Sequence, residues 1–143
     1  MATLLQSRAL GVATVQRTYV VDYTELDAAS TTQTVSLTTL PAGAIGLACW
    51  IDVTTAFSDA GSISALGIEV GDTADPNALV SSVDGFAVTG RSQNIAAGST
   101  EVWGGMAVEV KVTATGANLG DGAGTTNLDG GQVLVNLVYM VIS

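Results

Sequence analysis

The chain has 143 residues, which fit one domain, and it carries a formal net charge of -9 at pH 7 with only 12% charged side chains. It contains no histidine, one cysteine, and four lysines and arginines in total, so most of the side chains that act as proton shuttles, nucleophiles or transition-metal ligands near neutral pH are missing. The composition therefore indicates a structural or binding protein, disfavours an enzyme, and predicts no catalytic, cofactor or metal site.

The acidic balance also limits the partners. A net charge of -9 repels phosphate backbones and anionic lipid, and the basic residues Arg8, Arg17, Arg91 and Lys111 are scattered along the chain. No apolar run approaches the roughly 20 residues of a membrane-spanning helix. We therefore expect neither nucleic acid nor membrane as a partner. The small charged fraction instead favours a protein whose faces are partly covered by neighbours.

The first residues of the chain are apolar at three positions outside the strand pattern that follows. Leu4, Leu5 and Leu10 fit either a short amphipathic helix or an extended segment that crosses a neighbour, and Arg8 is the only basic residue among them. We predict that residues 1–14 form an N-terminal arm and that residues 15–143 form a β-sandwich domain. The alternative is that the arm folds back onto its own domain.

Alternating apolar residues then predict two strands. Residues 18–23 place Tyr19 and Val21 on one side, with polar and smaller residues between them. Residues 32–39 form a short strand rich in threonine, a residue type common in strands.

Residues 44–57 repeat the alternation over a longer stretch. One side of this predicted strand consists of Ile45, Leu47, Cys49, Ile51 and Val53. Trp50 lies on the other side, where either a loop covers it or it faces a partner. Within this apolar run, Cys49 is interpreted as a small buried hydrophobe rather than a reactive thiol.

Three further segments follow. Residues 62–70 predict a strand, and residues 72–82 predict a short helix or a turn, since Pro76 can open a helix. The clearest alternation lies in residues 106–114, where valines occupy one face and Glu109 and Lys111 the other.

The last strand, residues 132–142, differs from the others because it is apolar on both faces, with Asn136 as the only polar residue inside the run. Such a strand is either central in a covered sheet or has one face against another subunit. Together with the few surface charges, this strand predicts a homo-oligomer.

Short strands separated by turns rich in glycine, proline and aspartate predict the fold class. We expect an all-β, single-domain antiparallel β-sandwich or jelly roll with an N-terminal arm. The residues predicted to share its core are Val108, Val110, Val112, Val135 and Leu137.

Two glycine- and aspartate-rich segments are the main candidates for a ligand site. Residues 116–131 contain a run similar to a phosphate loop, but no Lys-Ser or Lys-Thr follows it and the next element is a strand. Calcium is a weaker alternative for this segment and for residues 71–77, because the ligand spacing of an EF-hand is missing. Asp121 and Asp129 are weakly supported as an acid and base pair. We interpret both segments as turns.

Three runs carry a resemblance to a known family: residues 51–57, 68–76 and 112–119, followed by the apolar carboxyl-terminal strand. They resemble small β-sandwich structural proteins of tailed bacteriophages, and among these the head decoration, or cement, proteins. The resemblance covers residues 43–143 and lies in strand and turn residues, so it transfers no catalytic residue.

This resemblance implies a virion protein on the outer capsid surface that binds the major capsid protein and stabilises contacts between capsomers, often as a homotrimer. In that setting Leu4, Leu5, Arg8 and Leu10 of the arm would contact the shell or an adjacent subunit. The alternatives are a tail, baseplate or fibre component, and a carbohydrate-binding jelly-roll module. A sugar-binding face should gather exposed aromatic residues, whereas the two tryptophans lie on separate strands.

Overall fold

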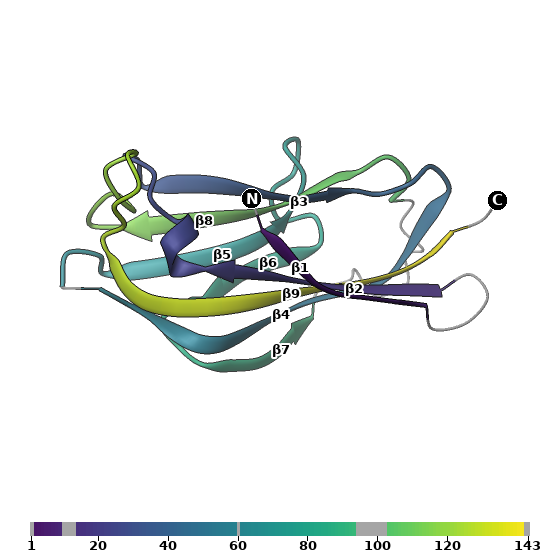
Figure 1. Ribbon diagram of the computed structural model, residues 1–143, viewed down its shortest axis with the longest axis horizontal. Coiled ribbons are helices and arrows are strands. Elements are labelled where there is room, and N and C mark those ends of the chain that lie inside the picture. Colours follow the sequence, from purple (N-terminus) through teal and green to yellow (C-terminus); the bar gives the residue numbers. More distant parts are fainter. Residues whose placement is uncertain (1, 10–13, 60, 94–102, 142–143) are drawn as a thin grey trace.

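The computed structural model describes residues 2–9, 14–59, 61–93 and 103–141. These residues form two antiparallel β-sheets packed face to face, with one 3-10 turn as the only helical element among them (Figure 1). The predicted all-β sandwich is therefore confirmed.

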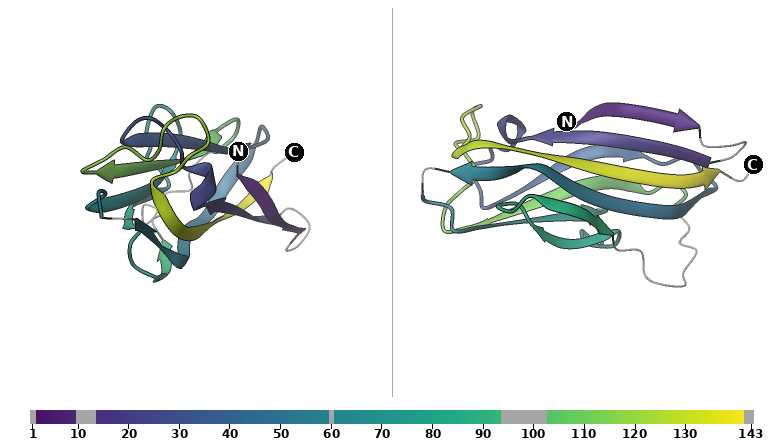
Figure 2. Two further views of the ribbon diagram at one scale, coloured as in Figure 1. Left: turned by 60° about the vertical axis from the view of Figure 1, so that its left-hand side comes forward. Right: turned by 90° about the horizontal axis from the view of Figure 1, so that it is seen from below.

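The first sheet has five strands in the order β1-β2-β9-β4-β7 (Figures 1 and 2). Their bounds are β1 Thr3–Ala9, β2 Thr14–Asp22, β9 Leu128–Val141, β4 Ala44–Asp59 and β7 Thr89–Gln93. The longest two strands, β4 and β9, pair with each other in the middle of the molecule. The edges of this sheet are β1 and β7.

The second sheet has four strands in the order β3-β8-β5-β6. Their bounds are β3 Thr32–Thr39, β8 Ala107–Thr115, β5 Ala65–Gly71 and β6 Val80–Asp84. After β2, a 3-10 turn (η1, Tyr23–Glu25) leads the chain from one sheet to the other. A capping box fixes the direction of this turn. The Asp22 side chain accepts a hydrogen bond from the Thr24 N–H, and the Glu25 side chain accepts one from the Asp22 N–H.

One hydrophobic core lies between the sheets. The five residues predicted to share it are all 1% exposed or less, and they belong to one cluster. Those on β8 face those on β9 because each strand alternates with a period of two. This part of the prediction is confirmed.

The predicted row along β4 is wrong at its start. Leu47 is 40% exposed and Ile45 is only half-buried, whereas Cys49 and Ile51 point inward. The pairing with β9 shifts between Gly46 and Ala48, and a bulge of this kind reverses which residues face the core. Gly46 occupies the inward-facing position instead. A glycine is needed there because a Cβ would overlap the indole ring of the buried Trp103.

The apolar last strand, β9, occupies the centre of its sheet between β2 and β4. Its inner face is fully buried, and its outer face includes Leu134, Val138 and Met140, which are half-buried. The central position in a covered sheet explains why the inner face of β9 is apolar. The outer face is the part that the single chain leaves uncovered.

Residues 72–82 contain no helix. Asp72 accepts hydrogen bonds from the backbone N–H groups of Ala74 and Asp75, at 3.0 and 2.8 Å, and the chain turns directly into β6. An aspartate that holds the backbone in this way competes with helix formation. Of the two predictions for this segment, the turn is correct.

Candidate functional site

The predicted contact residues lie on the edge of the five-stranded sheet. Leu4 and Leu5, in β1, are 47% and 59% exposed. Arg8 is in the same strand, with its backbone opposite Gln16 of β2. Leu10 lies outside the described residues. The structure thus brings three of the four predicted positions onto one edge strand, which we call the β1 edge (Thr3–Ala9).

In the single chain, the segment expected to form an arm lies against its own domain. It is a strand, not the helix considered as one alternative, and it pairs with β2 with an irregularity between Leu4 and Gln6. Ala2 is 7% exposed, and its N–H donates to the Ser36 carbonyl of the other sheet at 3.5 Å. Strand β1 forms the outer edge of its sheet (Figure 2). What remains available for contact is the exposed surface of the two leucines.

Arg17, beside this edge, is a residue that the sequence analysis missed. Its guanidinium carbon lies 5.8 Å from the centre of the Tyr139 ring, a cation–π distance. Its Nε is buried and has no hydrogen-bond partner in the described part of the chain. Burial raises the pKa of Tyr139, opposed in part by the charge of Arg17. The alternation of β2 contained the signal, because Arg17 stands in the same inward row as Tyr19 and Val21.

The outward side of the same sheet carries an apolar surface, which we call the β9 face. It consists of two groups of half-buried residues on either side of Asn136: Val20 and Leu134 at one end, and Ile45, Val138 and Met140 at the other. The cross-strand register brings these residues, far apart in the sequence, onto one side of the sheet.

A polar chain crosses the middle of this face. The Thr18 hydroxyl donates to Asn136 Oδ1 at 2.7 Å, Asn136 Nδ2 donates to Asp52 Oδ2 at 3.3 Å, and Trp50 Nε1 donates to the same oxygen at 3.2 Å. Trp50 is only 8% exposed. Of the two alternatives predicted for it, coverage within the chain is therefore correct and exposure toward a partner is not. These hydrogen bonds explain the single polar residue in the apolar last strand.

The glycine- and aspartate-rich loops form turns, as interpreted from the sequence. Asp121 accepts from the N–H groups of Ala123 and Thr125, at 2.7 and 3.0 Å, and these bonds lower the pKa of its carboxyl. Asp59 has its pKa lowered in the same way, chiefly by the N–H of Ile63. Both carboxylates are therefore occupied by the backbone of their own loops.

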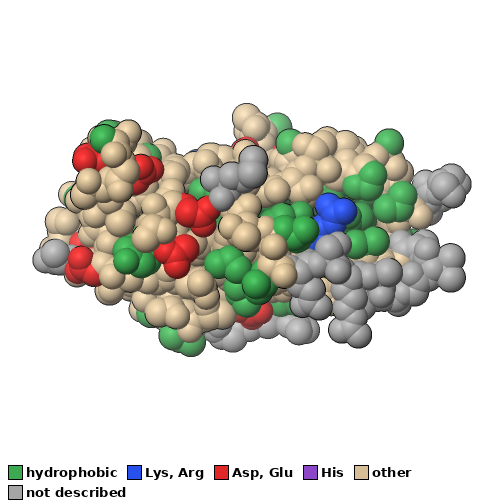
Figure 3. Space-filling view, viewed as in Figure 1, with side chains coloured by type: hydrophobic (Ala, Val, Ile, Leu, Met, Phe, Trp, Pro, Cys, Tyr) green, Lys and Arg blue, Asp and Glu red, His purple; other side chains and the backbone are tan. Residues whose placement is uncertain are grey.

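Acidic side chains gather toward one end of the molecule, where these loops lie (Figure 3). They do not converge: within the described ranges, no three acidic or cysteine side chains are close enough together to hold a metal ion. The described residues also include no helix long and apolar enough to cross a bilayer.

Comparison with known proteins gives similarity in structure but not in sequence. No protein-family model matches the chain. No curated protein matches it either. Among solved structures, a chain from the capsid of Ralstonia phage GP4 is 16% identical, with a TM-score of 0.54 over 96% of this chain and 92% of that chain. A chain from the cyanophage Pam1 capsid asymmetric unit is also 16% identical, with a TM-score of 0.49 over 96% and 93%. The first of these similarities shows a shared fold.

Proposed function

We propose that the chain is a structural protein of a bacteriophage virion, and that it binds the outside of the head as a decoration, or cement, protein. The observation that carries the proposal is the fold shared with a chain from the capsid of Ralstonia phage GP4. The strand order supports it. The run β2-β9-β4-β7 faces β3-β8-β5-β6, which is the order of an eight-stranded jelly roll, a fold used by viral capsid domains.

The chemistry of the chain supports a role without catalysis. It has no histidine, and its one cysteine is fully buried. A net charge of -9 disfavours contact with packaged DNA and so favours the outer surface of the particle. The major capsid protein is the partner in this proposal, and the bound chain would join neighbouring capsomers.

The β1 edge is the proposed contact with the shell or an adjacent subunit. Leu4 and Leu5 are exposed apolar side chains on this edge strand, at 47% and 59% exposure. Arg8 lies in the same strand, and Leu10 follows it. Arg17 adds a half-buried cation beside this edge, and the accessible part of its guanidinium would pair with a carboxylate of the partner.

Self-association as a homotrimer uses the β9 face in this proposal. In a ring of three copies each contact joins two different patches, because only a two-fold axis brings a patch against itself. We infer that the β9 face of one copy meets a surface of the next copy other than the β1 edge, which leaves the β1 edge for the shell. Contacts of this kind commonly bury about 800 Å² on each partner.

Electron cryomicroscopy of the phage particle that contains this chain tests the proposal directly. We expect density for the sandwich outside the head shell, in groups of three. Density on the tail, baseplate or fibres would favour the alternative structural role, and density inside the shell would contradict the outer placement.

A further inference from the structure

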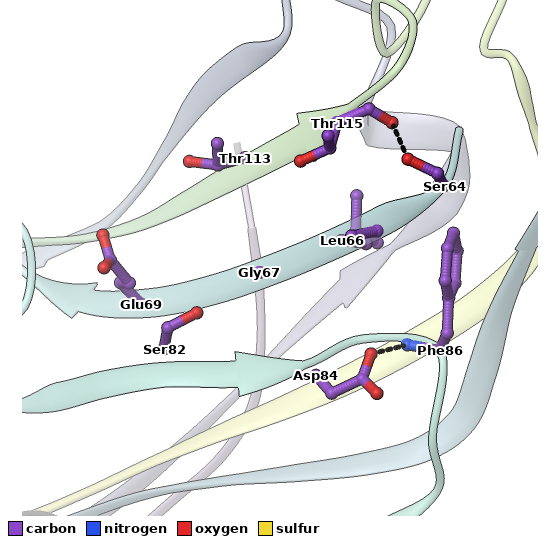
Figure 4. A pocket seen from close by; sticks show the side chains of 10 residues that line it. Ser64, Leu66, Gly67, Glu69, Ser82, Asp84, Phe86, Thr113 and Thr115 are labelled. Atoms are coloured by element: carbon purple, nitrogen blue, oxygen red, sulfur yellow. Dashed lines mark hydrogen bonds between the residues drawn. The ribbon is translucent and has the colours of Figure 1, made fainter. Parts of the chain in front are cut away.

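A hollow on the four-stranded sheet is distinct from every surface described above. It has a volume of about 620 Å³ and lies on the side of β5, β6 and β8 that points away from the core (Figure 4). Its size falls within the range of clefts that hold small ligands. Gly67 forms part of its lining: a Cβ at this position would come 2.7 Å from Ser82 Oγ, so the glycine keeps the space between β8 and β6 open.

Hydroxyls and carboxylates surround this hollow. Ser82 and Asp84 reach it from β6, Thr113 and Thr115 from β8, and Glu69 from β5 (Figure 4). Among the described residues that line it, none is a lysine or an arginine. Asp84 accepts one hydrogen bond from the Phe86 N–H, at 2.9 Å, through Oδ1. The hollow thus offers several acceptors and exchangeable hydroxyls to a ligand that donates many hydrogen bonds.

Phe86 supplies an aromatic ring at one end of the hollow. The Asp84 turn holds its backbone, and its ring, half-buried, stands beside Leu66 and Ser64 (Figure 4). A fixed ring presents a flat apolar face, on which the C–H side of a sugar ring packs well. One aromatic face among polar groups is the usual combination for orienting a small polar ligand.

From these features we propose that the hollow is a binding site for a neutral carbohydrate. Sugar hydroxyls donate to carboxylates in strong, charge-assisted hydrogen bonds, while the ring C–H groups contact Phe86. The carboxylates repel phosphate and other anions. Lys111 stands directly opposite Glu69 in the β5–β8 pairing, which reduces the attraction for a cation.

This site goes beyond the structural role proposed above and does not depend on it. The hollow lies on the β6 side of the sandwich, where β6 packs against β7, and β7 is the edge of its sheet opposite β1. A copy held through the β1 edge therefore leaves the hollow open to the surroundings.

Saturation-transfer NMR on the purified chain tests the proposal. The probes are neutral trisaccharides of glucose, mannose, galactose and N-acetylglucosamine, each at millimolar concentration. We expect transfer to at least one of them, and at least tenfold weaker binding in Glu69→Gln and in Phe86→Ala. Gly67→Val, which places a side chain in the hollow, should abolish the signal. Circular dichroism checks the fold of each variant, and Glu69→Gln is the substitution least able to disturb the core.

Thr34→Ala is the matched control, because Thr34 is exposed on the same sheet face but lies on β3, outside the hollow. It should bind as the original chain does. The absence of transfer to all four trisaccharides would overturn the proposal, as would binding that survives Glu69→Gln, Phe86→Ala and Gly67→Val. Spermidine serves as a cationic probe: its binding without any sugar binding would also overturn the carbohydrate assignment. None of these results depends on where the chain sits in a particle.

Discussion

Cys49 lies on the inner side of β4 with none of its surface exposed. Burial raises the pKa of its thiol, so neither the reactive thiolate nor access for a reagent is present in the folded chain. The interpretation of this residue as a small buried hydrophobe is confirmed.

We predict that a thiol-specific reagent labels Cys49 only after unfolding. In the folded chain at neutral pH, labelling should be slower by orders of magnitude than in denaturant, because the chain must open first. The measurement is absorbance of the released chromophore against time, with and without guanidinium. Rapid labelling of the native chain would contradict the buried position of the thiol.

The hydrogen bonds of Asp121 predict how the stability of the long loop before β9 changes in acid. Its folded-state pKa is lowered by the N–H groups of Ala123 and Thr125, so the charged carboxylate stabilises the loop. That contribution is present above the ordinary aspartate pKa and is lost as the pH falls through the lowered, folded-state value. Asp121→Ala should therefore reduce the free energy of unfolding at neutral pH, and the difference from the original chain should shrink in acid.

Denaturant unfolding at several pH values measures this difference. Asp129→Ala is the control, because Asp129 is an exposed aspartate at the start of β9, directly after the same loop. A gap between Asp121→Ala and the original chain that widens in acid would show that the sign is wrong.

At the scale of elements, β9 presents two different surfaces. Leu137 is fully buried against the other sheet, and Leu134 is half-buried on the β9 face. We predict that Leu137→Ala lowers the free energy of unfolding by about 2 to 5 kcal/mol, because it leaves a cavity in a closely packed core. Leu134→Ala should cost less, roughly 1 kcal/mol, since part of its surface meets water in the single chain.

Urea unfolding at low protein concentration compares the two variants, so that self-association contributes little. Equal losses would mean that the β9 face is as well covered as the core within one chain. In that case the inference of an open surface on this face would fail.

The strands that alternate regularly were predictable from the sequence, and the irregular ones were not. β3 and β8 follow their predicted bounds closely, because a period of two with threonine and valine is an unambiguous pattern. β1 was missed as a strand because Leu4 and Leu5 are adjacent and its pairing with β2 is irregular there. β7, with the sequence TGRSQ, has no apolar side to reveal it. A local pattern cannot report a bulge or an edge strand, since partner strands determine both.

The candidate surfaces were predictable to a similar degree. Leu4 and Leu5 were identified because they are apolar but lie outside the strand pattern predicted from the sequence, and the structure leaves both exposed. Arg17 and the hollow on the four-stranded sheet were not found. The alternation of β2 carried a signal for Arg17. The hollow depends on strands distant in sequence, since only the register brings Glu69, Ser82 and Thr113 together.

At the scale of the whole molecule, the distribution of charge can be followed on the face shown in Figure 3. Acidic side chains gather toward the loop end, whereas the basic side chain visible in Figure 3 lies among hydrophobic ones toward the other end. An acidic end repels other copies and polyanions, and an apolar region with few charges favours contact. On the face shown, this arrangement favours contact through the end that carries fewer acidic side chains.

The β9 face makes the self-association testable by one substitution. Val138 is half-buried on this face, beside the polar chain through Asn136. We predict that Val138→Lys shifts the chain from the trimer to the monomer in sedimentation equilibrium at micromolar concentration, because an interface of this kind cannot bury an unpaired charge. Thr113→Lys, exposed on the other sheet, should leave the mass unchanged. A monomeric original chain, with no grouping on the particle, would contradict the homotrimer.

The attachment prediction compares the two edges of the five-stranded sheet. Leu5 on β1 is 59% exposed, and Val88, just before β7, is 68% exposed. Leu5→Thr keeps a residue type suited to strands but removes apolar surface, so it should leave the circular dichroism spectrum and melting temperature nearly unchanged. Burial of a leucine side chain in a contact is worth about 1.5 to 3 kcal/mol, so we expect roughly tenfold or greater loss of affinity for undecorated heads. Val88→Thr, the matched control, should bind as the original chain does, and co-sedimentation with heads measures both. If Leu5→Thr binds unchanged while Val88→Thr is weakened, the chain attaches through the opposite edge.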